Sequence, residues 1–214
     1  MVDGADRSGR DAAAEAEPLG ASVAMPSKPK LTPEQYLEIE RRAEGKSEYC
    51  DGEMHARPGG TGPHCTIAVN VMVALGLQLR DRPDLVFGSD LRVLAAPSGL
   101  YTYPDVCVVC GEPRYLDATR DVLLNPTVIV EVLSPSTEAY DRGAKFKRYR
   151  EIESLRAYLL VSSDSVGLEL FTREPDGRWT LSTVDQADGT LALEAIGCTL
   201  LASDVYEKVE FGAA

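Results

Sequence analysis

Two acidic residues interrupt apolar segments in the middle of the chain. Asp105 follows Pro104 at the head of the apolar run 103–110, and Glu131 lies inside the run 126–136. A buried carboxylate is costly unless a cation or a metal compensates its charge. Carboxylate oxygens are ligands that suit Mg²⁺ or Mn²⁺. The pattern therefore predicts a metal-binding pair of acids, although a solvated Asp105 and a Glu131 paired with a core arginine remain alternatives.

Strand alternation predicts where the two side chains point. In an extended strand Glu131 shares a face with Ile129 and Leu133, and Asp105 shares a face with Cys107 and Val109. Both faces are apolar, which predicts two central strands that are covered on both sides. If these strands pair, the two acids can converge at one end of the sheet.

The segment after Glu131 has helical periodicity and contains a lysine on its apolar side. The apolar arc consists of Phe146, Tyr149 and Ile152. Lys145 and Arg142 fall within this arc, whereas Lys147 lies nearly opposite its centre. Because lysine is rarely buried, Lys145 is predicted to pair with Glu131 or with a bound phosphate; extension past Tyr149 to solvent is the alternative.

The remaining pattern predicts one α/β (α+β) domain with a mixed central β-sheet flanked by helices. We expect a disordered tail over 1–29 and the domain over 30–210. A helix capped by Thr32 should run to about residue 43, and a hairpin should turn at Asp51-Gly52. A second helix is expected over 64–80. Strands are expected at the following ranges: 84–88, 90–95, 103–109, 127–133, 157–161, 167–173 and 179–184.

Composition limits the classes of function. The net charge of −12 argues against a broad basic surface for nucleic acid. We find no signal peptide and no apolar run long enough to span a bilayer, so a cytoplasmic location is expected. The five scattered cysteines are expected to be free thiols, and Cys107 and Cys110 should point to opposite faces of one strand rather than form a metal or redox pair.

Three sequence blocks, in this order and spacing, resemble the Uma2 family of the PD-(D/E)XK restriction-endonuclease-like superfamily. They read Tyr-Pro-Asp-Val (103–106), Val-Glu-Val-Leu-Ser-Pro-Ser-Thr (130–137) and Asp-Arg-Gly-Ala-Lys-Phe-Lys-Arg-Tyr (141–149). The resemblance extends from the Leu-Thr-Pro-Glu-Gln-Tyr block (31–36) to about residue 205. It implies a restriction-endonuclease-like core, an endonuclease activity, Mg²⁺ or Mn²⁺ as cofactor, nucleic acid (DNA first) as substrate, and a homodimer.

The same resemblance implies roles for individual residues. Asp105 and Glu131 would be the catalytic, metal-binding acids. The superfamily usually has a lysine two residues after the second acid, where this chain has Leu133, so Lys145 would be the displaced equivalent. Glu48 and His64 fall where the family tends to carry polar residues near the site, and Glu48 is the stronger candidate. A hairpin cap for Glu48 and a surface position for His64 are the alternatives.

Two other classes of function remain open. One is a binding or regulatory protein that keeps the nuclease fold without catalysis, which the acidic charge and the missing lysine at position 133 favour. The other is a metal-dependent hydrolase of a small phosphoester, which suits an acidic chain better than long duplex DNA does.

Overall fold

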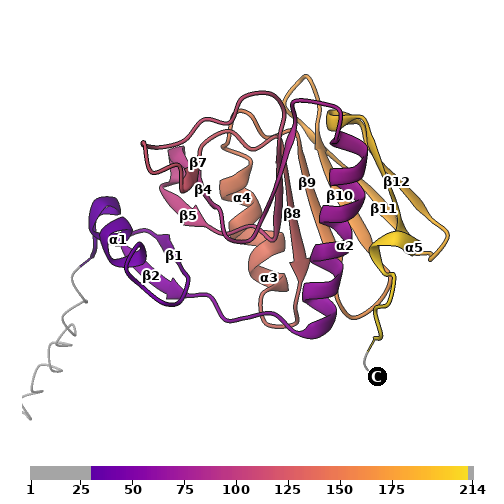
Figure 1. Cartoon of the computed structure of the whole chain (residues 1–214), viewed down its shortest axis with the longest axis horizontal. Coiled ribbons are helices and arrows are strands. Elements are labelled where there is room, and N and C mark those ends of the chain that lie inside the picture. Colours follow the sequence, from indigo (N-terminus) through magenta and orange to yellow (C-terminus); the bar gives the residue numbers. More distant parts are fainter. Residues whose placement is uncertain (1–29, 212–214) are drawn as a thin grey trace, which may run out of the picture.

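The computed structural model describes residues 30–211, so the tail expected over 1–29 lies outside the described part of the chain. Helices alternate with short strands along the sequence (Figure 1). The helices are α1 (Pro33–Glu40), α2 (Gly62–Leu79), α3 (Glu138–Tyr140), α4 (Phe146–Tyr149) and α5 (Ala202–Val205), with a π-helical segment η2 (Asp141–Lys145) and two 3-10 turns, η1 (Ala96–Ser98) and η3 (Glu194–Ile196).

Within residues 30–211 the strands form three sheets. A six-stranded sheet has the order β11-β10-β9-β8-β6-β3, a five-stranded sheet the order β2-β1-β5-β4-β7, and β12 and β13 form a third. The bounds are β1 (Ser47–Cys50), β2 (Glu53–Ala56), β3 (Leu85–Gly88), β4 (Arg92–Ala95), β5 (Leu100–Thr102), β6 (Val106–Val109), β7 (Val122–Leu123), β8 (Val128–Leu133), β9 (Ala157–Ser162), β10 (Leu168–Arg173), β11 (Trp179–Val184), β12 (Thr190–Leu193) and β13 (Cys198–Leu201).

The six-stranded sheet is mixed, as predicted. Strand β8 pairs with β6 in antiparallel and with β9 in parallel orientation. The helical segment α3–η2–α4 is the crossover that connects the two parallel strands, as a parallel pair requires. The structure thus confirms the mixed α+β fold expected from the sequence.

Both faces of the central strands are buried, and the alternation along β8 sorts its residues between two cores. Val128, Val130 and Val132 face a core that also contains Ile67 and Val71 of α2. Ile129 and Leu133 face a second core on the opposite side of the sheet, built with Phe146 and Tyr149 of α4. Glu131 therefore points toward the crossover helix and not toward α2.

Local signals position the N-terminal elements. Thr32 and Gln35 form a capping box at the start of α1. Asp51 and Gly52 both have positive φ angles, 53° and 90°, which is the backbone of the tight hairpin turn predicted between β1 and β2. This hairpin joins β5 through Tyr49 and so becomes part of the five-stranded sheet.

Helix α2 corrects one expectation. By length and composition alone it could cross a membrane, with a mean hydropathy of 1.3 over its 18 residues, whereas the sequence analysis expects no such run. Its residues Ile67, Val71, Leu75 and Leu79 are buried against the sheet. A helix that packs one face on a core meets the same criteria of length and composition, so the finding carries no further conclusion.

The cysteines match their predicted placement. All five are free, and Cys107 and Cys110 belong to the two cores on opposite sides of the sheet. Burial raises the pKa of Cys107 to about 12, which makes its thiolate an unfavourable species at neutral pH.

Candidate active site

Asp105 and Glu131 lie side by side at one end of the β6–β8 pair. Val106 is paired with Val130, so Asp105, one residue earlier, stands at the position opposite Glu131. Both side chains are buried, and Oδ2 of Asp105 accepts a hydrogen bond of 2.7 Å from the backbone N–H of Val132. The predicted convergence of the two acids is confirmed, and β6 itself begins one residue after Asp105.

Lys145 points from the crossover helix into this pair. Its side chain is only 4% exposed, and Nζ lies 2.9 Å from Oε1 of Glu131. The same atom lies 3.3 Å from Oε1 of Glu48 and 3.3 Å from Oδ1 of Asp141. The predicted inward orientation is confirmed, and it arises at the end of a π-helical segment, a distortion common at functional sites.

Arg142 has a different environment from the one its helical position predicted. Its side chain is 35% exposed and does not contact Asp105 or Glu131. It pairs instead with Glu138 and with Glu169 of β10. The π-helical segment changes the angular spacing, so an ideal α-helical projection misplaces this residue.

Glu48 belongs to the site, as the stronger of the two additional candidates. Strand β1 carries it, and its Oε1 accepts a hydrogen bond of 2.5 Å from the hydroxyl of Thr102 in β5. The same oxygen lies 3.3 Å from Lys145 and 3.5 Å from Nη1 of Arg57. The five-stranded sheet therefore contributes one acid to a site otherwise built on the six-stranded sheet and its crossover helix.

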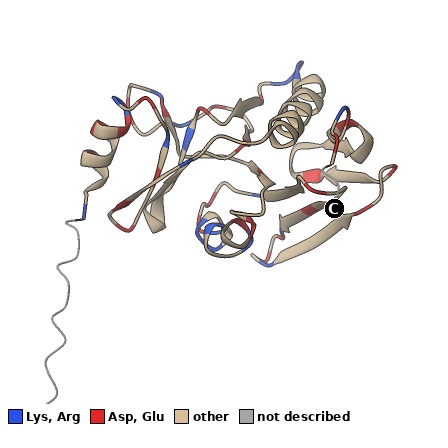
Figure 2. Cartoon of the chain, turned by 90° about the horizontal axis from the view of Figure 1, so that it is seen from below, with Lys and Arg blue, Asp and Glu red and all other residues tan. Residues whose placement is uncertain are grey.

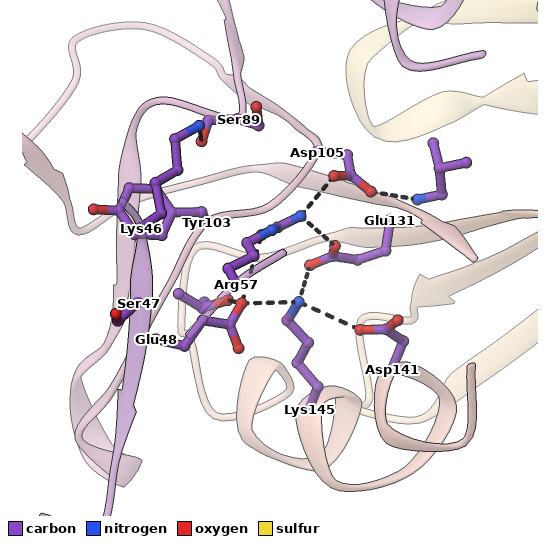
Figure 3. Close-up of polar contacts among 12 residues, drawn as sticks. Lys46, Ser47, Glu48, Arg57, Ser89, Tyr103, Asp105, Glu131, Asp141 and Lys145 are labelled. Atoms are coloured by element: carbon purple, nitrogen blue, oxygen red, sulfur yellow. Dashed lines mark hydrogen bonds and ion pairs between the residues drawn. The ribbon is translucent and has the colours of Figure 1, made fainter. Parts of the chain in front are cut away.

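Arg57 follows β2 and points between the acids (Figure 3). Its Nη2 lies 2.6 Å from Oδ1 of Asp105 and 4.0 Å from Oε2 of Glu131. No sequence pattern pointed to Arg57, because it stands in a polar segment and has no periodic relation to either acid.

His64, at the start of α2, contacts Asp105. Its Nε2 lies 3.2 Å from Oδ2 of Asp105. A Cβ at Gly60 would come within 2.6 Å of Nδ1 of His64, so glycine at that position allows the imidazole to lie there. The structure thus favours a site position for His64 over a surface one.

Three further residues complete the cluster without having been identified from the sequence as site residues. Tyr149 donates a hydrogen bond of 2.8 Å from its hydroxyl to Oε1 of Glu131, and it lies 3.4 Å from the hydroxyl of Thr102. Asp141 is buried beside Lys145. Tyr149 lies on the predicted apolar arc, but nothing in a single sequence shows that its hydroxyl would have a buried acceptor.

The pKa values of the cluster reflect burial set against pairing. Burial raises the pKa of Glu131 to about 7, with Lys145 opposing and Asp105 reinforcing that change. Burial also acts to raise the pKa of Asp105 and of Glu48, but hydrogen bonds and neighbouring cations hold both below their ordinary values. Burial acts to lower the pKa of Lys145, yet Glu131, Glu48 and Asp141 outweigh it and raise that pKa.

The donor set fits a hard divalent cation in its chemistry. The cluster contains four carboxylates and two permanent cations, so full ionisation of the acids leaves a net charge of −2. The acids are Glu48, Asp105, Glu131 and Asp141, and the cations are Arg57 and Lys145. Within residues 30–211, no group of three or more His, Cys, Asp or Glu side chains is arranged to hold a metal ion. Mg²⁺ commonly uses only one or two protein carboxylates and keeps several waters, so two acids are sufficient donors.

The chain is similar in sequence to a known protein family and to individual proteins. A family model named Uma2 and described as "Putative restriction endonuclease" matches residues 33–202. Two uncharacterized proteins of Synechocystis sp., slr1290 and sll1609, are 40% and 36% identical over 183 and 152 residues. These alignments cover 86% and 71% of this chain and 95% and 86% of the relatives.

A solved structure shares the fold. It is described as a putative nuclease belonging to DUF820 from Anabaena variabilis, with a TM-score of 0.67 and 17% sequence identity over 81% of this chain and 96% of that one. The family match spans both acids, Lys145 and Glu48. The chain therefore belongs to the Uma2 family and has a nuclease-like fold.

Proposed function

We propose that this chain is a metal-dependent endonuclease that hydrolyses phosphodiester bonds. The buried pair of Asp105 and Glu131 carries the proposal, because two carboxylates on adjacent strands are costly to bury unless cations compensate them. A lysine that reaches the same pair from a helix adds the cationic group that phosphoryl chemistry needs.

Each residue of the site would have a distinct role in this reaction. Asp105 and Glu131 would hold one or two Mg²⁺ ions, and Mn²⁺ should substitute. A metal held by these two acids would supply Lewis acidity toward the scissile phosphate and would lower the pKa of an attacking water. Lys145 orients that water or stabilises the negative charge that develops on the phosphate. Glu48 and Asp141 fix the position of Nζ of Lys145 from two sides.

Substitution of the two acids tests the activity. Asp105→Asn and Glu131→Gln keep the side-chain shape and should abolish Mg²⁺-dependent cleavage while the circular dichroism spectrum stays that of the wild type. Asp188→Asn, at an exposed turn position, should leave cleavage unchanged. The substrates are plasmid DNA, single-stranded DNA, RNA and a model phosphodiester, each with Mg²⁺ and with Mn²⁺. Full activity in either site variant would refute the assignment.

A catalytically inactive nuclease-fold protein is the second candidate, because Arg57 and Lys145 already pair with the acids. Calorimetric titration with Mn²⁺ separates the two functions. A catalyst should bind Mn²⁺ at a site that Glu131→Gln weakens strongly. Absence of both Mn²⁺ binding and cleavage would favour the inactive protein.

DNA is the substrate that we propose first, on the resemblance to restriction endonucleases. Acidic and basic positions are interspersed over the ribbon (Figure 2). With a net charge of −12, affinity for long duplexes should be low and should depend on the basic groups in the site. Preference for the model phosphodiester over every nucleic acid tested would instead indicate a hydrolase of small phosphoesters.

We further propose that the chain forms a homodimer through the outer face of α2. Val69, Val73 and Leu77 are more than half exposed there. The whole of α2 contains no Lys, Arg, Asp or Glu, so it is drawn without charge colours in Figure 2. Two copies of an acidic chain repel each other, and a charge-free apolar face is where that repulsion is weakest.

A further inference from the structure

Arg57 occupies the space between the carboxylates that a metal would need. Its guanidinium contacts Asp105 at 2.6 Å, Glu48 at 3.5 Å and Glu131 at 4.0 Å (Figure 3). The side chain is only 19% exposed, so these pairs are poorly screened by solvent. The two nitrogens at the end of the guanidinium thus reach acids from both sheets.

A guanidinium and a divalent cation cannot both be held between Asp105 and Glu131 without strong repulsion. The Coulomb energy between like charges a few ångströms apart is large where solvent is excluded. Lys145 approaches Glu131 from the helix side and contacts no atom of Asp105 in the ion pairs of the described residues. Arg57 is therefore the cation that stands between the two proposed metal ligands.

We propose that Arg57 is an internal counter-cation of the metal-free site, which a divalent cation displaces and which then binds the substrate phosphate. This inference rests on the metal-dependent function proposed above. In the metal-free protein the guanidinium neutralises Asp105 and Glu131. Once the metal binds these acids, the guanidinium loses Asp105 and Glu131 as partners and keeps only the longer contact to Glu48. Its planar fork of donors matches a phosphate group in geometry.

The chain around Arg57 permits this movement. Its backbone N–H is fixed by a hydrogen bond of 2.8 Å to the carbonyl of Lys46, so only the side chain needs to turn. Pro58, Gly59 and Gly60 follow, exposed and outside regular structure, and a Cβ at Gly59 would meet nothing within 4 Å. The long side chain can leave the acids without disturbing β2.

Metal affinity tests the first half of the proposal without any measurement of cleavage. Arg57→Gln removes the competing charge, so calorimetric titration with Mn²⁺ should show affinity increased on the order of tenfold or more over the wild type. Arg57→Lys keeps the charge but loses the planar guanidinium fork that reaches Glu48 and Asp105 through separate nitrogens, so its Mn²⁺ affinity should fall between those of the wild type and Arg57→Gln. Arg41→Gln is the matched control, because Arg41 also pairs with two acids, Asp117 and Asp121, away from the site; its Mn²⁺ affinity should equal that of the wild type.

The outcomes separate this inference from the proposed function. Suppose that the wild type binds Mn²⁺ and that Asp105→Asn abolishes this binding, but that neither Arg57 variant gains affinity. Arg57 then does not compete with the metal, and this inference is wrong while the metal-dependent function stands. If neither the wild type nor the Arg57 variants bind Mn²⁺, both the metal-dependent function and this inference fail. Thermal unfolding in EDTA checks that each variant is folded, and Arg57→Lys carries the test if Arg57→Gln is not.

Binding of a labelled DNA duplex in Ca²⁺ tests the second half. Arg57→Gln should bind the duplex more weakly than the wild type although it binds metal more tightly. These opposite changes distinguish a residue that moves from metal ligands to phosphate from one that only supports the fold. Equal duplex affinity in the two proteins, including no measurable affinity in either, overturns the phosphate role.

Discussion

The Nζ atom of Lys145 lies 2.9 Å from Oε1 of Glu131, although the two residues belong to different elements. Two positions after Glu131, where the superfamily usually has its lysine, Leu133 is buried in the core with Ile129. The ammonium group beside Glu131 thus comes from the crossover helix and not from β8 itself. The position of this group depends on how η2 and α4 pack on the sheet.

Loss of Lys145 should destabilise the fold. Lys145→Met leaves the buried Glu131 and Asp141, and the partly buried Glu48, without their shared cation. Removal of one partner of a buried ion pair costs about 3–5 kcal/mol. Urea unfolding in EDTA measures the change. Lys147→Met, at an exposed position of α4 in the same crossover segment, should change stability by no more than about 0.5 kcal/mol. Equal stability of the Lys145 variant and the wild type would show that the acids are neutral in the folded protein.

The hydroxyl of Tyr149 should contribute to stability through Glu131. Tyr149→Phe keeps the packing of a fully buried ring but removes a hydrogen bond of 2.8 Å to the carboxyl group, and bonds to charged groups contribute about 1.5–3 kcal/mol. Tyr49→Phe is the comparison, since its hydroxyl donates to the neutral carbonyl of Leu31 at 2.8 Å and should cost only about 0.5–1.5 kcal/mol. Urea unfolding at a pH above the raised pKa of Glu131, about 7, should rank the two variants in this order, because the carboxyl group is ionised there. The reverse order would contradict a hydrogen bond from Tyr149 to an ionised Glu131.

Stability should fall with rising pH near neutrality because of His64. The hydrogen bond with Asp105 is the largest cause of its raised pKa, so the folded protein holds a proton on His64 that the unfolded chain releases more readily. This stabilisation is fully present below the ordinary histidine pKa of 6.5 and is lost as the pH rises through the raised value.

Substitution of the two histidines in turn isolates this effect. His64→Asn should make the free energy of unfolding, measured in EDTA, less dependent on pH in that window. His55→Asn, at an exposed position of β2, should retain the slope of the wild type. If all three proteins had the same slope, the imidazole of His64 would not be charged in the folded state.

Much of the site could be predicted because its signals are local. Alternation along β8 placed Glu131 on the face of Ile129 and Leu133, and helical periodicity turned Lys145 inward. The N-cap at Thr32 of α1 and the turn at Asp51-Gly52 depend on neighbouring residues alone, and both form as predicted.

Features that depend on tertiary pairing could not be predicted from one sequence. The strands β5 and β7 have only three and two residues, which is too short for an alternation to be recognised. Yet β5 holds the hairpin that brings Arg57 and Glu48 to Asp105. The β12–β13 pair was also missed, although β3 and β4 have the same length of four residues and were predicted.

Self-association should depend on the outer face of α2. Val73→Glu and Leu77→Glu each place a like charge on a face that has none, and the wild-type residues are 54% and 61% exposed. Two copies that meet through this face would bury both new charges without partners, which is unfavourable. Sedimentation velocity should therefore show a wild-type dimer and monomeric variants.

Another exposed leucine gives the matched control for this surface. Leu181 on β11 is 52% exposed, so Leu181→Glu adds the same charge at a similarly exposed position outside α2. This variant should leave the dimer intact. A monomeric wild type would contradict the proposed dimer altogether. A dimer that withstands both α2 substitutions but not Leu181→Glu would place the interface on β11, where an edge strand offers its backbone to a second copy.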